Sequence, residues 1–219
     1  MRANRLRFHG WIAGLGTASG TRLVLGHWPR SPLGSFSDVM AEHPDGHRVL
    51  LAPSARIAEF VSATYRFDEV RTQPVTVLRT EADWSVDAGP LRLRFTPGAR
   101  TALGALLRAV PPALAANTTW TALCDLPARL LLPGVRTRGS AGGGRREWYA
   151  ARDVHRITAA RASWDGRDLG PLRPVVPPVR FGFGSAPPRP ALTRILTTVE
   201  AAGTAAVPDT DPAEPAPES

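Results

Sequence analysis

The residue types best suited to hold a charged ligand gather in one segment, residues 136–156. A glycine-rich loop, "GSAGGGRR", is followed at once by an aromatic pair, and arginines stand on both sides of it. Backbone amides of such a loop can approach a phosphate or carboxylate, and arginine forks match both anions in geometry. The alternative is a mobile hairpin loop with solvated arginines on one strand face. The candidate ligand-binding residues are Arg136, Arg138, Arg145, Arg146, Trp148 and Tyr149.

The same segment holds the candidates for acid–base catalysis. Asp153 and His155 are two residues apart, so they share a face if the segment is a β-strand. The sequence has no Gly-x-Ser-x-Gly elbow for a nucleophilic serine. Its single cysteine, Cys124, stands in the apolar run "TALCDL", which is typical of an inert core thiol. An enzyme built on this chain would therefore depend on Asp153 and His155.

Two histidines flank a tight turn and are the candidates for metal ligands. His43 and His47 enclose Pro44-Asp45-Gly46, and two imidazoles across a hairpin can bind a divalent ion, with His9 or His27 completing the site. No helical His-x-x-x-His or other known ligand frame accompanies them. We therefore interpret both as exposed turn residues and predict no metal and no cofactor.

The segment Gly14-x-Gly16-x-x-x-Gly20 is one residue longer than a dinucleotide-binding fingerprint. That fingerprint needs a helix after its last glycine, with the helix N-terminus at the pyrophosphate. Only "TRLVLGHW" separates Gly20 from Pro29, and it is rich in strand-forming residues with Gly26 in the middle. The glycines therefore predict the turn of a hairpin rather than a nucleotide site.

Missing residue types exclude several classes of chemistry. All 27 basic residues are arginine, so Schiff-base, pyridoxal-phosphate and Walker-A lysine mechanisms are excluded. One cysteine excludes an internal disulfide, a redox CxxC pair and a cysteine-rich zinc site. With no apolar run of membrane-spanning length and no clear signal peptide, these features predict a soluble cytoplasmic protein without a membrane span.

The net charge of +8 is unevenly distributed. The segment 201–219 is acidic and rich in proline and alanine, and we predict that it is a disordered tail after a single domain at residues 1–200. The basic body favours anionic partners. Abundant Arg, Ala, Gly and Pro also match a GC-rich genome, so the charge is partly compositional.

The elements that must position these residues are mostly strands. Alternation predicts a first hairpin from "RLRFH" and "TRLVLGHW", and a second around Pro44-Asp45-Gly46. Helical spacing predicts helices at residues 54–67, with Ser54 as N-cap, and 99–110, with a third over 121–132. Short strands with few helices between them predict an α+β fold of mainly antiparallel sheet, a barrel or half-barrel with two or three short helices.

Three segments carry a resemblance: "GHWPRSPLGSFSDVM", "LLAPSARIAEFVSATYRFDEV" and "TRGSAGGGRREWYAARDVHRI". They resemble a family of hypothetical proteins from bacteria with GC-rich genomes, over most of residues 5–200. The resemblance implies that this span is one domain. It implies no activity and no site residue.

Six tryptophans are spread over nearly every predicted element, as core packing or as the lining of an apolar pocket. Our leading hypothesis is binding of a small anionic or amphipathic molecule in a pocket lined by tryptophan and arginine. One alternative is an enzyme that uses histidine and aspartate. The other is binding of nucleic acid or a protein surface through an arginine face, for which no recognition motif is present. The sequence does not predict an oligomeric state.

Overall fold

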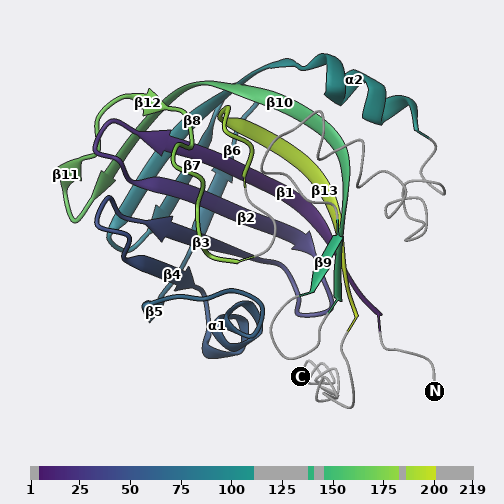
Figure 1. Ribbon diagram of the computed structural model, residues 1–219, viewed down its shortest axis with the longest axis horizontal. Coiled ribbons are helices and arrows are strands. Elements are labelled where there is room, and N and C mark those ends of the chain that lie inside the picture. The colour runs from purple at the N-terminus through teal and green to yellow at the C-terminus, as the bar shows by residue number, and fades with distance from the viewer. Residues whose placement is uncertain (1–4, 111–137, 141–145, 183–185, 201–219) are drawn as a thin grey trace, which may run out of the picture.

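The fold is a long, curled and mainly antiparallel sheet with two short helices among the described residues (Figure 1). The computed structural model describes residues 5–110, 138–140, 146–182 and 186–200. The strands are β1 (Arg5–Thr17), β2 (Arg22–Arg30), β3 (Phe36–Glu42), β4 (Arg48–Ala52), β5 (Glu69–Thr72), β6 (Thr76–Arg79), β7 (Trp84–Ala88), β8 (Leu91–Arg100), β9 (Arg138–Ser140), β10 (Arg146–Trp164), β11 (Arg167–Asp168), β12 (Leu172–Arg173) and β13 (Ala191–Glu200). The helices are α1 (Ala55–Ser62) and α2 (Ala102–Ala109).

The predicted α+β half-barrel is confirmed in this curled sheet. The third predicted helix, over 121–132, and the predicted tail, over 201–219, lie outside the described residues. Along the sheet the strands follow the order β5-β4-β3-β2-β1-β13-β10-β8-β7-β6. The C-terminal strand β13 lies between β1 and β10, so the two ends of the described chain meet in the middle of the sheet.

Both predicted hairpins are present, and the first explains the glycine pattern. β1 and β2 pair antiparallel around a turn in which Gly20 has a φ of +86°. Gly14 and Gly16 lie inside β1 rather than in the loop. A Cβ on Gly14 would lie 2.4 Å from the Ala186 Cβ, and one on Gly16 would lie 2.3 Å from the Pro174 carbonyl oxygen. These two glycines therefore let Pro174 and Ala186 approach the strand closely.

Each helix begins at a side-chain cap and packs on the sheet. In α1 the Ser54 hydroxyl accepts from the Ile57 amide, and Ile57, Ala58 and Val61 are buried. In α2 the Thr101 hydroxyl accepts from the Gly104 amide. Gly104 rests directly on β10, since a Cβ there would lie 2.5 Å from the Val154 carbonyl oxygen. Neither helix has the length or apolar character to cross a membrane, and no other helix is present among the described residues.

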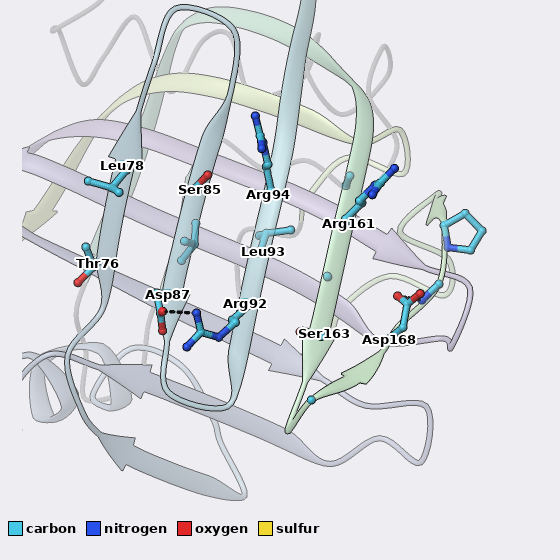
Figure 2. Close-up of a pocket in the computed structure, with 16 residues that line it drawn as sticks. Thr76, Leu78, Ser85, Asp87, Arg92, Leu93, Arg94, Arg161, Ser163 and Asp168 are labelled. Atoms are coloured by element: carbon cyan, nitrogen blue, oxygen red, sulfur yellow. Dashed lines mark hydrogen bonds and ion pairs between the residues drawn. The ribbon is translucent and has the colours of Figure 1, made fainter.

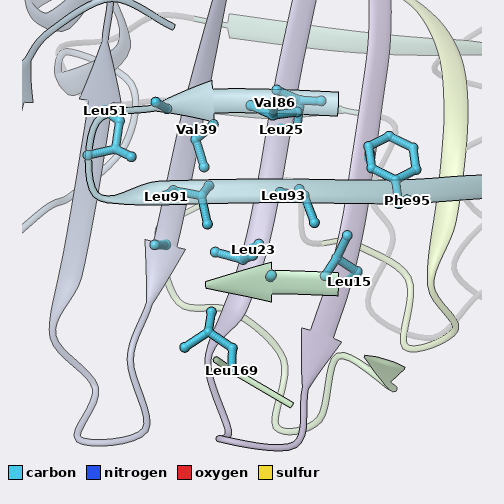
Figure 3. Packing of buried hydrophobic residues seen from close by; sticks show 14 of the residues in the cluster. Leu15, Leu23, Leu25, Val39, Leu51, Val86, Leu91, Leu93, Phe95 and Leu169 are labelled. Atoms are coloured by element: carbon cyan, nitrogen blue, oxygen red, sulfur yellow. The ribbon is translucent and has the colours of Figure 1, made fainter. Parts of the chain in front are cut away.

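The main core lies between the two ends of the curled sheet. Figure 3 shows β7 and β8 crossing over β1, β2 and β3, with apolar side chains of both layers between them. Leu15, Leu25, Val39 and Leu91 are each no more than 1% exposed. Alternate residues of β1–β4 form this inner face, so the intervening residues form a second, opposite face.

The opposite face of β1–β4 is covered by α1 and by the segments at residues 174–182 and 186–190. Phe8, Phe36, Leu50 and Val199 pack there with α1, and Val24 packs with Val175, Val179, Phe181 and Ala186. These strands are therefore buried on both faces. The candidate functional site lies in this second layer.

Candidate functional site

An aromatic cavity lies between the sheet and α1. Its volume is about 60 Å³, and its lining comes from β1, β2, β3, α1, β10, β13 and the residues after α1. The lining residues are Phe8, Ile12, Val24, Gly26, Trp28, Phe36, Asp38, Met40, Phe60, Val61, Thr64, Tyr65, Tyr149, Thr197 and Val199. Trp28, Phe60, Tyr65 and Tyr149 are only partly buried, so the cavity reaches the surface.

The strand register fixes which residues meet in this cavity. Ile12, Gly26 and Asp38 pair across β1, β2 and β3 and form one row. Residues in such a row point to the same face of the sheet. Phe8, Thr197 and Tyr149 form a second row across β1, β13 and β10. The two rows are four β1 residues apart, which is about 13 Å along a strand.

Gly26 makes room for a hydrogen bond within the first row. The Trp28 indole Nε1 donates to Asp38 Oδ1 at 3.1 Å. A Cβ on Gly26 would lie 2.6 Å from that oxygen and 2.7 Å from the indole nitrogen. Gly10 makes similar room on β1, because a Cβ there would lie 2.9 Å from the Trp28 ring. Two glycines therefore let the indole lie low over the sheet and reach the carboxyl group.

Asp38 is the unusual group of this cavity. It is 4% exposed, and its only side-chain hydrogen bond among the described residues comes from Trp28. No arginine in the described chain forms an ion pair with it. Burial raises the pKa of Asp38 from 3.8 to about 7, although the indole hydrogen bond acts in the opposite direction. A buried carboxyl group in a cavity, with its pKa raised to about 7, makes Asp38 a candidate functional residue.

The second row adds hydroxyl groups. The hydroxyls of Tyr65 and Tyr149 are hydrogen-bonded to each other. Thr197 is 5% exposed, and its Oγ1 has no hydrogen-bond partner among the described residues. A buried hydroxyl without a partner is costly, so it marks a place where a water or a ligand is needed. The cavity thus has polar groups in both rows and apolar side chains between them.

A larger and more open depression lies on the outer face of β6, β7, β8 and β10. Its volume is about 750 Å³, and Arg92, Arg94 and Arg161 line it (Figure 2). Arg92 pairs with Asp87 at 2.9 Å, and Arg94 pairs with Asp83 at 2.6 Å. Two of these three arginines therefore already have a counter-charge. Neither cavity combines tryptophan with arginine among its described lining residues.

The residues predicted around the glycine-rich loop have separate locations. Arg136 and Arg145 lie outside the described residues, and for Arg138 and Arg146 only the strand backbone is described. Tyr149 lines the aromatic cavity. Its neighbour Trp148 is buried and lies under the guanidinium of Arg5, 5.9 Å from the ring centre. The structure thus brings one of the six predicted residues, Tyr149, to the aromatic cavity.

Asp153 and His155 do share a face of β10, as their spacing predicts. His155 Nε2 lies 3.5 Å from Asp153 Oδ2, and His155 Nδ1 contacts the Gly98 carbonyl oxygen at 3.0 Å. Arg100 Nε donates to both Asp153 oxygens, at 2.8 and 3.1 Å. Burial alone would raise the pKa of Asp153, but the hydrogen bond from Arg100 and the neighbouring positive charges lower it. This carboxylate fixes the start of α2 against β10, and neither described cavity contains it.

His43 and His47 stack across their turn, with ring centres 6.4 Å apart. His43 lies edge-on to Trp164, and His47 Nε2 contacts Glu69 Oε2 at 3.2 Å. Within the described parts of the chain, no three histidine, cysteine or acidic side chains are arranged to hold a metal ion. Both imidazoles therefore have protein partners. His47 is exposed as expected for a turn residue, whereas His43 packs on Trp164 and is only partly exposed.

The cavity residues Trp28, Gly26, Asp38 and Thr197 were not among the predicted site residues. Two signals for them stand in the sequence: Asp38 is an acid within the apolar run "FSDVM", and Gly26 interrupts a strand. An isolated strand glycine marks a close approach of another group. The two residues come together through the register of β2 and β3, which pairs Gly26 with Asp38.

Comparison with known proteins adds little to this geometry. No protein-family model and no curated protein sequence matches the chain. A solved structure from Nitrosomonas europaea, provisionally assigned as AttH, aligns with a TM-score of 0.33 and 10% identity. The alignment covers 92% of this chain and 52% of that one, so this chain spans about half its length. A likeness at this level carries no functional argument.

Proposed function

We propose that this protein binds a small amphipathic molecule, whose polar group enters the aromatic cavity and meets Asp38. The observation that supports it most is the burial of Asp38 with a single side-chain donor. One indole N–H cannot satisfy two carboxyl oxygens, each of which accepts up to two hydrogen bonds. A ligand that donates a hydrogen bond would supply a second donor to Asp38, which no described side chain provides.

The shape of the cavity supports the amphipathic part of the proposal. About 60 Å³ holds a polar group and a few carbon atoms, whereas a drug-sized ligand needs about 300 Å³ or more. The rest of the ligand would lie on the partly buried rings of Phe60 and Tyr65 at the rim. An anionic ligand suits this cavity poorly, because an ionised Asp38 would repel it. An anionic ligand would therefore bind in the outer arginine-lined depression rather than in this cavity.

Nuclear magnetic resonance of the Trp28 indole N–H tests the proposal. The probe is hexan-1-ol, a slim chain with one hydroxyl, and a Trp28→Phe variant assigns the signal. We expect a saturable shift of this signal at millimolar alcohol. Ile12→Phe should abolish the shift, because Ile12 lines the cavity and the larger ring fills part of it.

The matched control is Thr198→Val, next to the cavity residue Thr197. Thr198 is buried on the same strand but is not part of the cavity lining, so its removal should leave the alcohol isotherm unchanged. Thr197→Val should weaken binding if the orphan hydroxyl contacts the ligand. An unshifted Trp28 signal, or the same isotherm in the folded Ile12→Phe variant, would contradict binding in this cavity.

A further inference from the structure

We infer that the polar group bound at Asp38 is a protonated amine, held as an ion pair inside the ring of aromatic side chains. This inference rests on the proposed function and narrows it to one class of ligand. The charge and the aromatic composition of the cavity support the choice of an amine. A neutral donor would also fit, so the experiment below separates the two.

The charge of the cavity lining favours a cation as the ligand. Asp38 is the only carboxyl among the cavity residues, and no arginine or histidine lines the cavity within the described chain. Glu42 and Asp153, the other two buried acids among the described residues, each pair with an arginine, whereas Asp38 does not. Burying a single carboxylate without a counter-charge is strongly unfavourable. A ligand cation is the counter-charge that no described residue supplies.

The aromatic wall of the cavity favours a cation as well. Phe8, Trp28, Phe36, Phe60 and Tyr65 line the same cavity. Their rings already contact one another around Phe8, with centres 5.1 Å apart for Phe60 and 6.0 Å for Trp28. Aromatic faces attract cations through the ring quadrupole, and the attraction grows when the cation is desolvated. An aromatic cage closed by one carboxylate therefore suits an alkylammonium group better than a hydroxyl.

The surrounding titratable groups do not compete with Asp38. Tyr65 and Tyr149 line the cavity, and their hydroxyls are hydrogen-bonded to each other. On β2, His27 faces the other side of the sheet, where it contacts Ser37 and the ring of Trp84. The charged residues of α1, Arg56 and Glu59, are exposed. In the 174–182 segment, Arg180 is engaged by Glu42 at 3.0 Å.

Binding of the ammonium form is coupled to loss of a proton. The alkylammonium enters with its charge, the Asp38 carboxyl group releases its proton to the buffer, and the products are the ion pair and one hydrated proton. With a pKa of about 7, Asp38 is about one-tenth ionised at pH 6 and about nine-tenths ionised at pH 8. Affinity for an amine that stays protonated should therefore rise about tenfold between these two pH values.

The experiment compares three probes of equal length: hexylammonium, hexan-1-ol and hexanoate. Each is titrated at pH 6 and pH 8 while the Trp28 indole signal is observed. We expect hexylammonium to bind at least tenfold more tightly than hexan-1-ol at pH 8, with hexanoate weakest. Hexylammonium alone should gain about tenfold from pH 6 to pH 8.

Asp38→Asn provides the decisive variant, since it keeps the shape of the side chain and the acceptor for Trp28. It should lose the preference for the amine and its pH dependence, while hexan-1-ol still binds. The matched control is Asp87→Asn, which changes the net charge equally but lies on the exposed outer face. It should behave as the wild type does.

The outcomes separate the two proposals. If hexan-1-ol binds as tightly as hexylammonium at both pH values, the amine inference is overturned and the binding function stands. If none of the probes shifts the Trp28 signal, both are overturned. If Asp38→Asn does not fold, the wild type still decides, because hexylammonium that binds no more tightly than hexan-1-ol at pH 8 contradicts an ion pair with Asp38.

Discussion

Replacing Asp38 with asparagine should make the protein more stable at neutral pH, and the gain should depend on pH. Well below pH 3.8 the carboxyl group is protonated in both the folded and the unfolded chain, so it contributes no pH dependence there. Between pH 4 and pH 7 the unfolded chain ionises while the folded chain keeps the proton. The unfolded state then binds fewer protons, so stability falls as pH rises. Above the folded pKa the penalty is constant.

The magnitude follows from the two pKa values. Each pKa unit is equivalent to about 1.4 kcal/mol. The rise from 3.8 to about 7 therefore corresponds to about 4 kcal/mol of lost stability in the wild type at pH 8. Asparagine cannot ionise, so Asp38→Asn escapes this loss. Its amide donor adds an offset, but that offset is the same at every pH.

The assay is urea unfolding, followed by far-ultraviolet circular dichroism, of the wild type and Asp38→Asn from pH 4 to pH 8. The difference between the two free energies of unfolding cancels the contributions of all other titrating groups. We expect this difference to grow by about 4 kcal/mol over the range and to level off near pH 7. Asp87→Asn should show no comparable growth. A difference constant to within about 1 kcal/mol would mean that Asp38 is hydrated, and would refute the site as described.

Three further changes test other parts of the structure by chemical unfolding. Gly26→Ala should cost about 1–3 kcal/mol and shift the Trp28 indole signal, because the new Cβ collides with the hydrogen bond to Asp38. Glu42→Gln should cost about 3–5 kcal/mol, because it leaves the buried Arg22 guanidinium, 3.0 Å away, without its counter-charge; a cost below about 1 kcal/mol would contradict that role. Ser54→Ala should cost about 1 kcal/mol through loss of the α1 cap, and no loss would mean that the cap is dispensable.

Local patterns in the sequence located both hairpins and the two described helices, although both helices are shorter than predicted. Alternation and turn residues located β1–β2 and β3–β4, and helical spacing with a capping serine located α1. The position of β13 between β1 and β10 could not be predicted in the same way. It depends on pairing between residues almost 200 positions apart, such as Arg5 and Glu200, and no local pattern encodes such a pair.

The candidate site was missed for a related reason. Trp28 and Asp38 are ten residues apart, and their contact depends on the β2–β3 register and on the missing side chain of Gly26. The sequence favours the arginine-rich loop as the site instead, because clustered charges can be recognised in a sequence. The burial of a single acid cannot. Tyr149 was found only because it stands beside that loop.

Strands β1–β3 are buried on both faces. This arrangement explains how the fold tolerates the destabilising burial of Asp38. Val39 and Ala41 face the main core, while Asp38 and Met40 face the second layer under α1. The main core is complete without the second layer, since residues of β7 and β8 close it from the other side. An uncompensated carboxyl group in the second layer therefore lowers stability without opening the main core. Because the two layers are separate, Asp38→Asn should remain folded. A buried carboxyl group that lowers the stability of the fold points to a ligand rather than to packing.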